Sequence, residues 1–249
     1  MVFIVRRAFY QCFMLYKNGA AVTFALESAN VVGYQNIETV SGFNFFTPTF
    51  NKTGATEKSY NINDIQLDAS TATSWTDNIQ LLDEGGATVS TYYYVAAGEL
   101  LADKACWTED FATAVDFDIE AGTSFILETQ APVIITVSGE VLKGNLTLTS
   151  VAGFNFVGNA TPSGMNIQGI TLDAALATSW TDNIQLLDEG GSTIATYYYV
   201  AAGELLADKA CWTEDFATAA DVEIDAGQGF ILETTNGDVT ITLPMALAQ

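Results

Sequence analysis

The chain of 249 residues contains no histidine. This absence excludes a Ser-His-Asp triad, a Cys-His pair and a histidine-ligated zinc site. Carboxylates are the remaining groups for acid–base chemistry, as in a glycosidase, and the sequence Thr-Glu-Asp supplies them at 108–110 and again at 213–215. Both sequences fall in predicted turns, where acidic side chains usually face water, so we expect no catalytic residues and no enzymatic activity.

Basic residues are scarce. Only 8 lysines and arginines stand against 30 aspartates and glutamates, which gives a formal net charge of -22. Both arginines, Arg6 and Arg7, lie near the N-terminus. Nucleic acid is excluded as a partner because phosphate neutralisation needs a basic patch. The acidic excess favours solubility, and it opposes close association unless cations or apolar contacts offset the repulsion.

No apolar stretch near the N-terminus is long enough to span a bilayer as a helix, so we expect no integral membrane segment in the mature chain. Residues 1–27 combine Arg6 and Arg7 with an aromatic and apolar stretch and the sequence GAAVTFAL at 19–26. The pattern is typical of a secretory signal peptide. We therefore predict a signal peptide or N-terminal extension over 1–27 and a secreted, extracellular or cell-surface protein. The alternative is that this segment stays and packs as an ordinary strand or helix.

One segment occurs twice. Residues 74–114 recur at 179–219 with only Ala87, Val89 and Ser90 exchanged. Outside this block the spacing stays at 105 for Gly122 and Gly227, and it is 111 for the two GFNF sequences at 42–45 and 153–156. The first repeat therefore carries six extra residues between Phe46 and Asn63, which predict a surface loop. We place the two units at 28–138 and 139–249.

The periodicity of the repeated block indicates strands. Apolar and polar residues alternate over 78–82 and face a second alternating run at 88–95 across the turn 83–86, which predicts a β-hairpin. Further strand-like runs lie at 42–46, 61–67, 115–121, 124–129 and 133–137. We predict an all-β fold of two tandem, duplicated antiparallel β-sandwich domains. Residues 96–105 are predicted equally well as a short helix or a loop.

Two cysteines occupy equivalent positions, Cys106 and Cys211, each directly before a tryptophan. Equivalent positions in tandem domains lie too far apart for a disulfide. We expect small buried thiols; the alternative is a cross-link between neighbouring subunits after export.

Tyrosine triplets occur at 92–94 and 197–199. Because strand side chains alternate, the middle tyrosine faces one side of the sheet and the outer two face the other. Terminal segments at 28–38 and 238–243 could add a strand to a neighbour. The predicted self-assembly or aromatic contact surface consists of Tyr92, Tyr94, Tyr197, Tyr199, Val31, Val32, Tyr34, Val239 and Ile241. The alternative is that both faces of the sheet are buried.

No cofactor is expected, with calcium as the one candidate ion. Asp77, Asn78 and the turn 83–86 offer the oxygen ligands that calcium prefers. A spaced D-x-D-x-D-G loop is missing, however. Ordinary solvated carboxylates are the favoured interpretation of these turns, ahead of calcium ligands.

Several sequences resemble those of uncharacterised exported β-repeat proteins of Gram-negative bacteria: ESANVVGYQ at 27–35, GFNFF at 42–46, GFNFVGNATP at 153–162 and DAGQGFILE at 225–233. The resemblance implies export and a β fold, and it specifies no activity. The first repeat departs from the pattern at Thr47, Pro48 and Thr49, and at AGTSF over 121–125.

Two functions follow as expectations. The first is a structural, self-assembling surface protein, a filament or layer subunit whose partners are copies of itself. The second is a secreted carbohydrate-binding or adhesin module, with or without calcium, that uses Trp75, Trp107, the tyrosines and their counterparts to bind glycans.

Overall fold

The computed structural model describes residues 3–6, 12–15, 32–52, 58–83, 85–188 and 190–244. These residues form antiparallel strands and two short 3-10 helices, Ile62–Asp64 and Ile167–Gly169, with no α-helix among them. The prediction of an all-β fold of the sandwich type is confirmed. Residues 96–105 form turns and bends rather than a helix. None of the described residues belongs to a helix that is long and apolar enough to cross a membrane.

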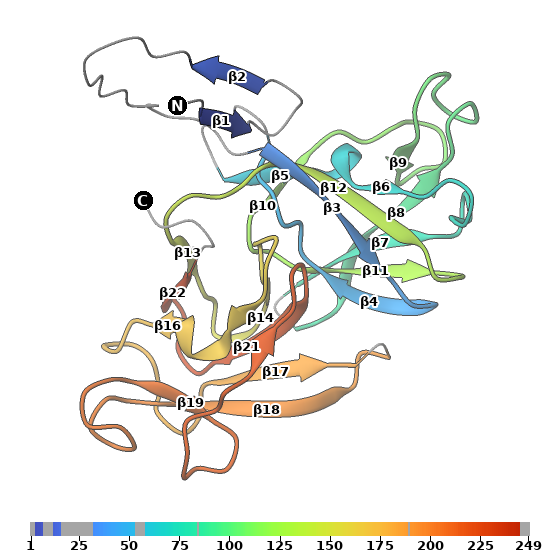
Figure 1. Ribbon diagram of the computed structural model, residues 1–249. Helices are drawn as coiled ribbons and strands as arrows, with labels where there is room; N and C mark the ends of the chain where they lie inside the picture. The colour runs from blue at the N-terminus through green and yellow to red at the C-terminus, as the bar shows by residue number, and fades with distance from the viewer. Residues whose placement is uncertain are drawn as a thin grey trace.

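We call residues 32–140 repeat 1 and residues 141–244 repeat 2. Each contains a five-stranded sheet (Figure 1). In repeat 1 the order is β4 (Gly42–Phe46), β11 (Phe125–Thr129), β7 (Asn78–Leu82), β8 (Thr88–Val95) and β9 (Cys106–Thr108). In repeat 2 the same order is β14 (Gly153–Gly158), β21 (Gly229–Thr234), β17 (Asn183–Leu187), β18 (Thr193–Val200) and β19 (Cys211–Thr213).

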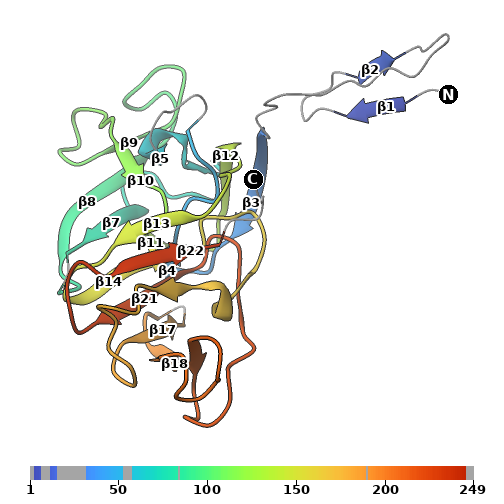
Figure 2. The same cartoon turned by 90° about the vertical axis from the view of Figure 1, so that its left-hand side faces the viewer.

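Smaller sheets complete each repeat, again in matching order. The three-stranded sheets are β3 (Val32–Glu38), β12 (Ile134–Glu140) and β6 (Gln66–Leu67), and β13 (Leu146–Thr149), β22 (Thr240–Leu243) and β16 (Thr171–Leu172). The two-stranded ribbons are β5 (Ser59–Asn61) with β10 (Asp118–Glu120), and β15 (Met165–Asn166) with β20 (Glu223–Ile224). Near the N-terminus, β1 (Phe3–Arg6) pairs only with β2 (Cys12–Leu15) (Figure 2).

Each repeat buries its own apolar core. In β11, Phe125, Leu127 and Thr129 point inward because strand side chains alternate, and they join buried residues of the smaller sheet such as Ile135. Trp107 lies fully inside, and its indole Nε1 donates a hydrogen bond to the Ile65 carbonyl at 3.2 Å. The counterparts in repeat 2 form a second core, which also takes in Ala121 from repeat 1.

The cysteine prediction is confirmed for Cys106 and Cys211, which are buried free thiols. Burial raises the pKa of both thiols, which keeps them in the protonated and less reactive form.

The two repeats contact each other through pairs of equivalent residues. The Thr47 amide donates to the Gly227 carbonyl at 2.9 Å, and the Gly158 amide donates to the Gly122 carbonyl at 2.9 Å. Thr47 corresponds to Gly158, and Gly122 corresponds to Gly227. The two bonds therefore join equivalent atoms, with the roles of the two repeats exchanged. This indicates a pseudo-twofold axis between the repeats.

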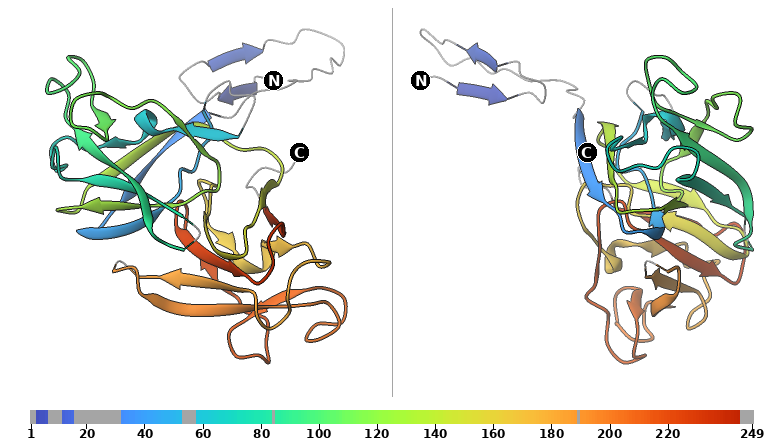
Figure 3. Two further views of the ribbon diagram at one scale, coloured as in Figure 1. Left: turned by 180° about the vertical axis from the view of Figure 1, so that it is seen from behind. Right: turned by 90° about the vertical axis from the view of Figure 1, so that its right-hand side faces the viewer.

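At this axis equivalent side chains meet. Phe45 stacks on its counterpart Phe156, with 6.4 Å between ring centroids and 22° between planes. Gly86 and its counterpart Gly191 face the same two rings, Phe156 and Phe45 respectively. We call this contact between the repeats the seam, and Figure 3 shows the two repeats joined there from two further sides.

The core can be tested with Ile79, which is fully buried, and Val89, which is exposed on the same hairpin. Ile79→Ala should lower the free energy of unfolding by about 2–5 kcal/mol because it leaves a cavity, whereas Val89→Ala should change it by less than about 0.5 kcal/mol. Urea unfolding of both variants provides the measurement. Equal effects would contradict the described packing.

Candidate functional site

Most of the predicted contact surface lies inside the protein, and this part of the prediction is corrected. Tyr94, Tyr197, Tyr199, Val239 and Ile241 are buried, as is Trp107 from the predicted sugar-binding set. Tyr94 packs edge-on against Trp107, with 5.7 Å between ring centroids. The outer tyrosines of each triplet therefore face the core side of the sheet, so the middle tyrosine is the one that faces outward.

The remaining predicted residues are spread over different places. Tyr92 is half-buried against Phe117, with 4.9 Å between ring centroids. Val31 lies outside the described residues, Val32 is half-buried and Tyr34 is 70% exposed on β3.

The two terminal segments differ in their pairing. Among the described strands, β3 pairs with β12 alone, so it lies at the edge of this sheet. Strand β22 lies between β13 and β16 and has no free edge to offer a neighbour. The prediction that 238–243 could add to another subunit is therefore corrected.

The middle tyrosines belong to a different and exposed group. In repeat 1, Tyr93 contacts Phe111 with 4.5 Å between ring centroids, and Phe111 lies 6.1 Å from Trp75. In repeat 2, the corresponding centroid distances are 4.7 Å for Tyr198 and Phe216 and 5.9 Å for Trp180 and Phe216. We call these groups aromatic cluster 1 (Trp75, Tyr93, Phe111) and aromatic cluster 2 (Trp180, Tyr198, Phe216).

The clusters face solvent. Phe111 is 52% exposed and Phe216 50%, while Trp180 is 38% exposed. Exposed aromatic groups on a soluble protein mark contact sites more often than chance. Aromatic rings also supply large contact areas at low cost in side-chain entropy.

The backbone beneath these rings is strained. Trp75 and Phe111 have φ angles of 65° and 59°, and Trp180 and Phe216 have 65° and 58°. Bulky residues avoid this left-handed region because it costs about 1–2 kcal/mol per residue. Of the five non-glycine residues with positive φ in the described part of the chain, four lie in the two clusters and the fifth is Asp238. The fold therefore holds the rings in place against a local preference, as is typical of functional sites.

A buried carboxylate organises the turn that carries Trp75. Asp77 accepts hydrogen bonds from the amides of Thr73 at 2.6 Å and Gln130 at 2.9 Å. The Trp75 amide in turn donates to the Tyr94 carbonyl at 2.7 Å. Asp182 makes the equivalent bonds in repeat 2, so the strained turn is built identically in both repeats.

A second carboxylate organises the turn that carries Phe111. Asp110 Oδ1 accepts from the amides of Ala112 at 2.9 Å and Thr113 at 2.8 Å, and its Oδ2 accepts from the Thr113 hydroxyl at 2.7 Å. These bonds, led by the Thr113 amide, hold the pKa of the Asp110 carboxyl far below its usual value. Asp215 is bound in the same way. The two Asp residues of the Thr-Glu-Asp sequences thus position Phe111 and Phe216.

One glutamate is bonded next to the tryptophan of each cluster. The Ser74 hydroxyl donates to Glu99, and the Ser179 hydroxyl donates to Glu204, next to the two tryptophans. Carboxylates accept hydrogen bonds but donate none. The clusters therefore combine apolar ring faces with strong acceptors, a combination that suits ligands rich in C–H and O–H groups and disfavours anions.

The described residues contain no group of three or more acidic or cysteine side chains placed to hold a metal ion. In the turn considered for calcium, Asp83 Oδ1 accepts from the amides of Gly85 and Ala87, both at 2.9 Å. This carboxylate closes the hairpin turn.

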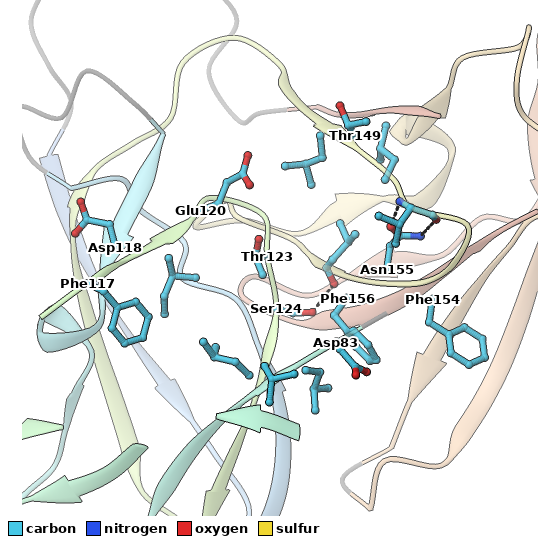
Figure 4. Close-up of a pocket in the computed structure, with 18 residues that line it drawn as sticks. Asp83, Phe117, Asp118, Glu120, Thr123, Ser124, Thr149, Phe154, Asn155 and Phe156 are labelled. Atoms are coloured by element: carbon cyan, nitrogen blue, oxygen red, sulfur yellow. Dashed lines mark hydrogen bonds between the residues drawn. The ribbon is translucent and has the colours of Figure 1, made fainter. Parts of the chain in front are cut away.

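The seam contains a groove of about 520 Å³. Figure 4 shows Phe117 and Asp118 on one side of the groove and Phe154, Asn155 and Phe156 on the other. The equivalent space across the pseudo-twofold axis is divided into pockets of about 340 and 150 Å³. The grooves on the two sides of the axis therefore differ, whereas the two aromatic clusters have the same geometry. We take the clusters as the candidate site because both repeats form them.

Sequence reasoning identified Trp75 and the tyrosine triplets but missed Phe111 and Phe216. The available signal was their position within the repeated block, directly after Asp110 and Asp215. Their left-handed backbone gave no signal, because only glycine and asparagine commonly mark such positions in a sequence.

No known protein family, characterised protein or solved structure matches the chain. The resemblance to exported β-repeat proteins therefore stays a prediction.

Replacing Phe111 by glycine and by alanine separates backbone strain from ring contacts. Both variants remove the ring, but glycine adopts positive φ without cost. Phe111→Gly should be more stable than Phe111→Ala by about 1 kcal/mol in urea unfolding. Equal stabilities would show that the left-handed conformation carries no strain.

Acid should weaken the two Asp-centred turns. The pKa values of Asp110 and Asp215 are lowered on folding, so their contribution to stability is present above the unfolded pKa and is lost as pH falls through the folded pKa. The double variant Asp110→Asn with Asp215→Asn should show a smaller fall in melting temperature below about pH 4 than the wild type. The control, Glu109→Gln with Glu214→Gln, should show the same fall as the wild type. An unchanged acid profile in the first variant would refute the assignment.

Proposed function

We propose that the protein is a secreted carbohydrate-binding module that presents two equivalent aromatic platforms to neutral glycans. The observation that carries the proposal is the pair of exposed aromatic clusters, each held by left-handed backbone at two bulky residues. The left-handed conformation of these residues lowers the stability of the fold, so its presence in both repeats supports a functional role for the rings. Sugar rings offer flat C–H faces, whose partial positive charge suits the negative face of an aromatic ring.

Charge narrows the ligand class. With a net charge of -22 and Glu99 or Glu204 beside each tryptophan, the clusters should reject uronic-acid and sulfated glycans and accept neutral or amino sugars. Carboxylate oxygens can accept hydrogen bonds from sugar hydroxyls.

The arrangement of the clusters supports adhesion to polymers. Strands β9 and β19, which pair with the tyrosine-bearing strands β8 and β18, lie far apart, at the upper right and near the bottom of Figure 1. Two sites fixed on one body bind a repeating polymer with an effective concentration that strengthens overall binding.

Self-assembly into a filament or layer is the second candidate. Its support is the sheet-edge strand β3 with Tyr34 exposed, since an open edge can pair with another chain. The charge opposes it, because repulsion between like-charged copies must be offset. Negative-stain microscopy that shows regular fibres or sheets of the pure protein would favour this candidate.

The carbohydrate proposal is tested with an array of neutral, amino and acidic glycans, followed by calorimetry with the best neutral or amino-sugar oligomer. Phe111→Ala should weaken binding at its own cluster about tenfold, because central aromatic residues carry much of the binding energy at contact sites. The double variant with Phe216→Ala should no longer be retained on a polymer of the same sugar.

Tyr34→Ala is the matched control, since it removes an exposed aromatic ring outside both clusters. Its affinity should equal that of the wild type. Binding of acidic glycans alone, or equal losses in Tyr34→Ala and Phe111→Ala, would overturn the proposal.

A further inference from the structure

The seam is assembled from equivalent surfaces, yet the two repeats differ in sequence where they meet. Thr47 of repeat 1 corresponds to Gly158 of repeat 2, and Ser124 corresponds to Gly229. Both positions lie in segments where repeat 1 departs from the sequences GFNFVGN and AGQGF, which repeat 2 contains.

The first pair of residues meets directly. Thr47 is fully buried, and a Cβ atom placed on Gly158 would overlap its hydroxyl and lie 2.6 Å from its Cβ. A side chain fits on only one of the two positions. Gly158 has no left-handed backbone that would require glycine, so close packing is what excludes a larger residue there. Thr47 makes the closest approach, and the Gln228 carbonyl oxygen lies 3.0 Å from the same Cβ position.

The second pair repeats the arrangement. A Cβ atom on Gly229 would lie 2.9 Å from the Cβ of Ser124, closer than real Cβ contacts, and 3.1 Å from the carbonyl carbon and Cβ of Phe45. Ser124 also crosses the seam, since its hydroxyl donates to the Val157 carbonyl at 2.9 Å and its amide donates to the Phe156 carbonyl at 3.0 Å. Both larger residues belong to repeat 1 and both glycines to repeat 2.

Two other glycines show the contrasting case. Gly122 and Gly227 have φ angles of 86° and 74°, and each faces apolar side chains of the opposite repeat. Here the backbone itself requires glycine, and both repeats keep it. The repeats are thus alike where the backbone imposes the residue and different where two side chains would compete for one space.

From these pairs we infer that the seam is a selective docking surface: the face of repeat 1 fits the face of repeat 2 and does not fit another copy of itself. Pairing two repeat 1 faces would bring Thr47 against Thr47 and Ser124 against Ser124. Pairing two repeat 2 faces would leave gaps at both sites, which lose packing contacts. The mismatch disfavours joining of separate chains through like repeats, a form of specificity by exclusion.

The shape, rather than the polarity, of Thr47 carries this selectivity. Its hydroxyl is buried and has no hydrogen-bond partner among the residues that the structure describes. Thr47→Val keeps the volume and removes the unpaired group, so it should keep or raise the urea midpoint of unfolding.

The test is an exchange of side chains across the seam in the full chain. Gly158→Thr alone should lower the urea midpoint and raise the radius of gyration in X-ray scattering, because the clash opens the seam. Thr47→Gly alone should lower the midpoint less. The double variant, with the threonine on the other repeat, should recover most of the midpoint and the compact radius, since residues in contact give non-additive effects.

Further variants keep the test decisive. Gly158→Thr combined with Ser41→Gly should show no recovery, because Ser41 bonds to Gln130 within repeat 1. If Gly158→Thr fails to fold, Gly158→Ala with and without Thr47→Gly replaces it, and Ser124→Gly with Gly229→Ser provides an independent exchange. Additive losses in the double variants that exchange residues across the seam would overturn the inference.

Discussion

The alternation of side chains along β8 and β18 is the constraint from which the rest of each repeat follows. Tyr94 turns inward onto Trp107 and fills the core, which obliges Tyr93 to face outward. The outward tyrosine then forms the base on which Phe111 and Trp75 gather. One period-two pattern thereby supplies both the buried aromatic packing and the exposed aromatic cluster.

Part of this arrangement is readable in the sequence. The alternation over 78–82 and 88–95 predicted a hairpin that the structure forms as β7 and β8. The run at 61–67 divides instead into β5, a 3-10 helix and β6, because Asn61 accepts a hydrogen bond from the Asn63 amide and starts a helical turn. Which side of the sheet each tyrosine faces could not be predicted, since it depends on whether the smaller sheet covers one face or the other.

The aromatic clusters were only partly predictable for a similar reason. Trp75 was recognisable as a candidate ligand-binding residue. The turns in which Trp75 and Phe111 adopt positive φ angles, however, depend on Asp77 and Asp110. Their hydrogen bonds to the backbone arise only once the turns have formed. The seam was unpredictable from one sequence as well, although the residues that build it were visible as departures between the repeats.

The four tryptophans offer a direct way to measure whether the two clusters bind neutral or amino glycans. Trp75 and Trp180 lie in the clusters, whereas Trp107 and Trp212 are buried. In a nitrogen–proton NMR titration with a neutral or amino-sugar oligosaccharide, the indole signals of Trp75 and Trp180 should shift while those of Trp107 and Trp212 stay in place. Cluster signals that stay fixed across neutral and amino-sugar oligosaccharides would contradict the account.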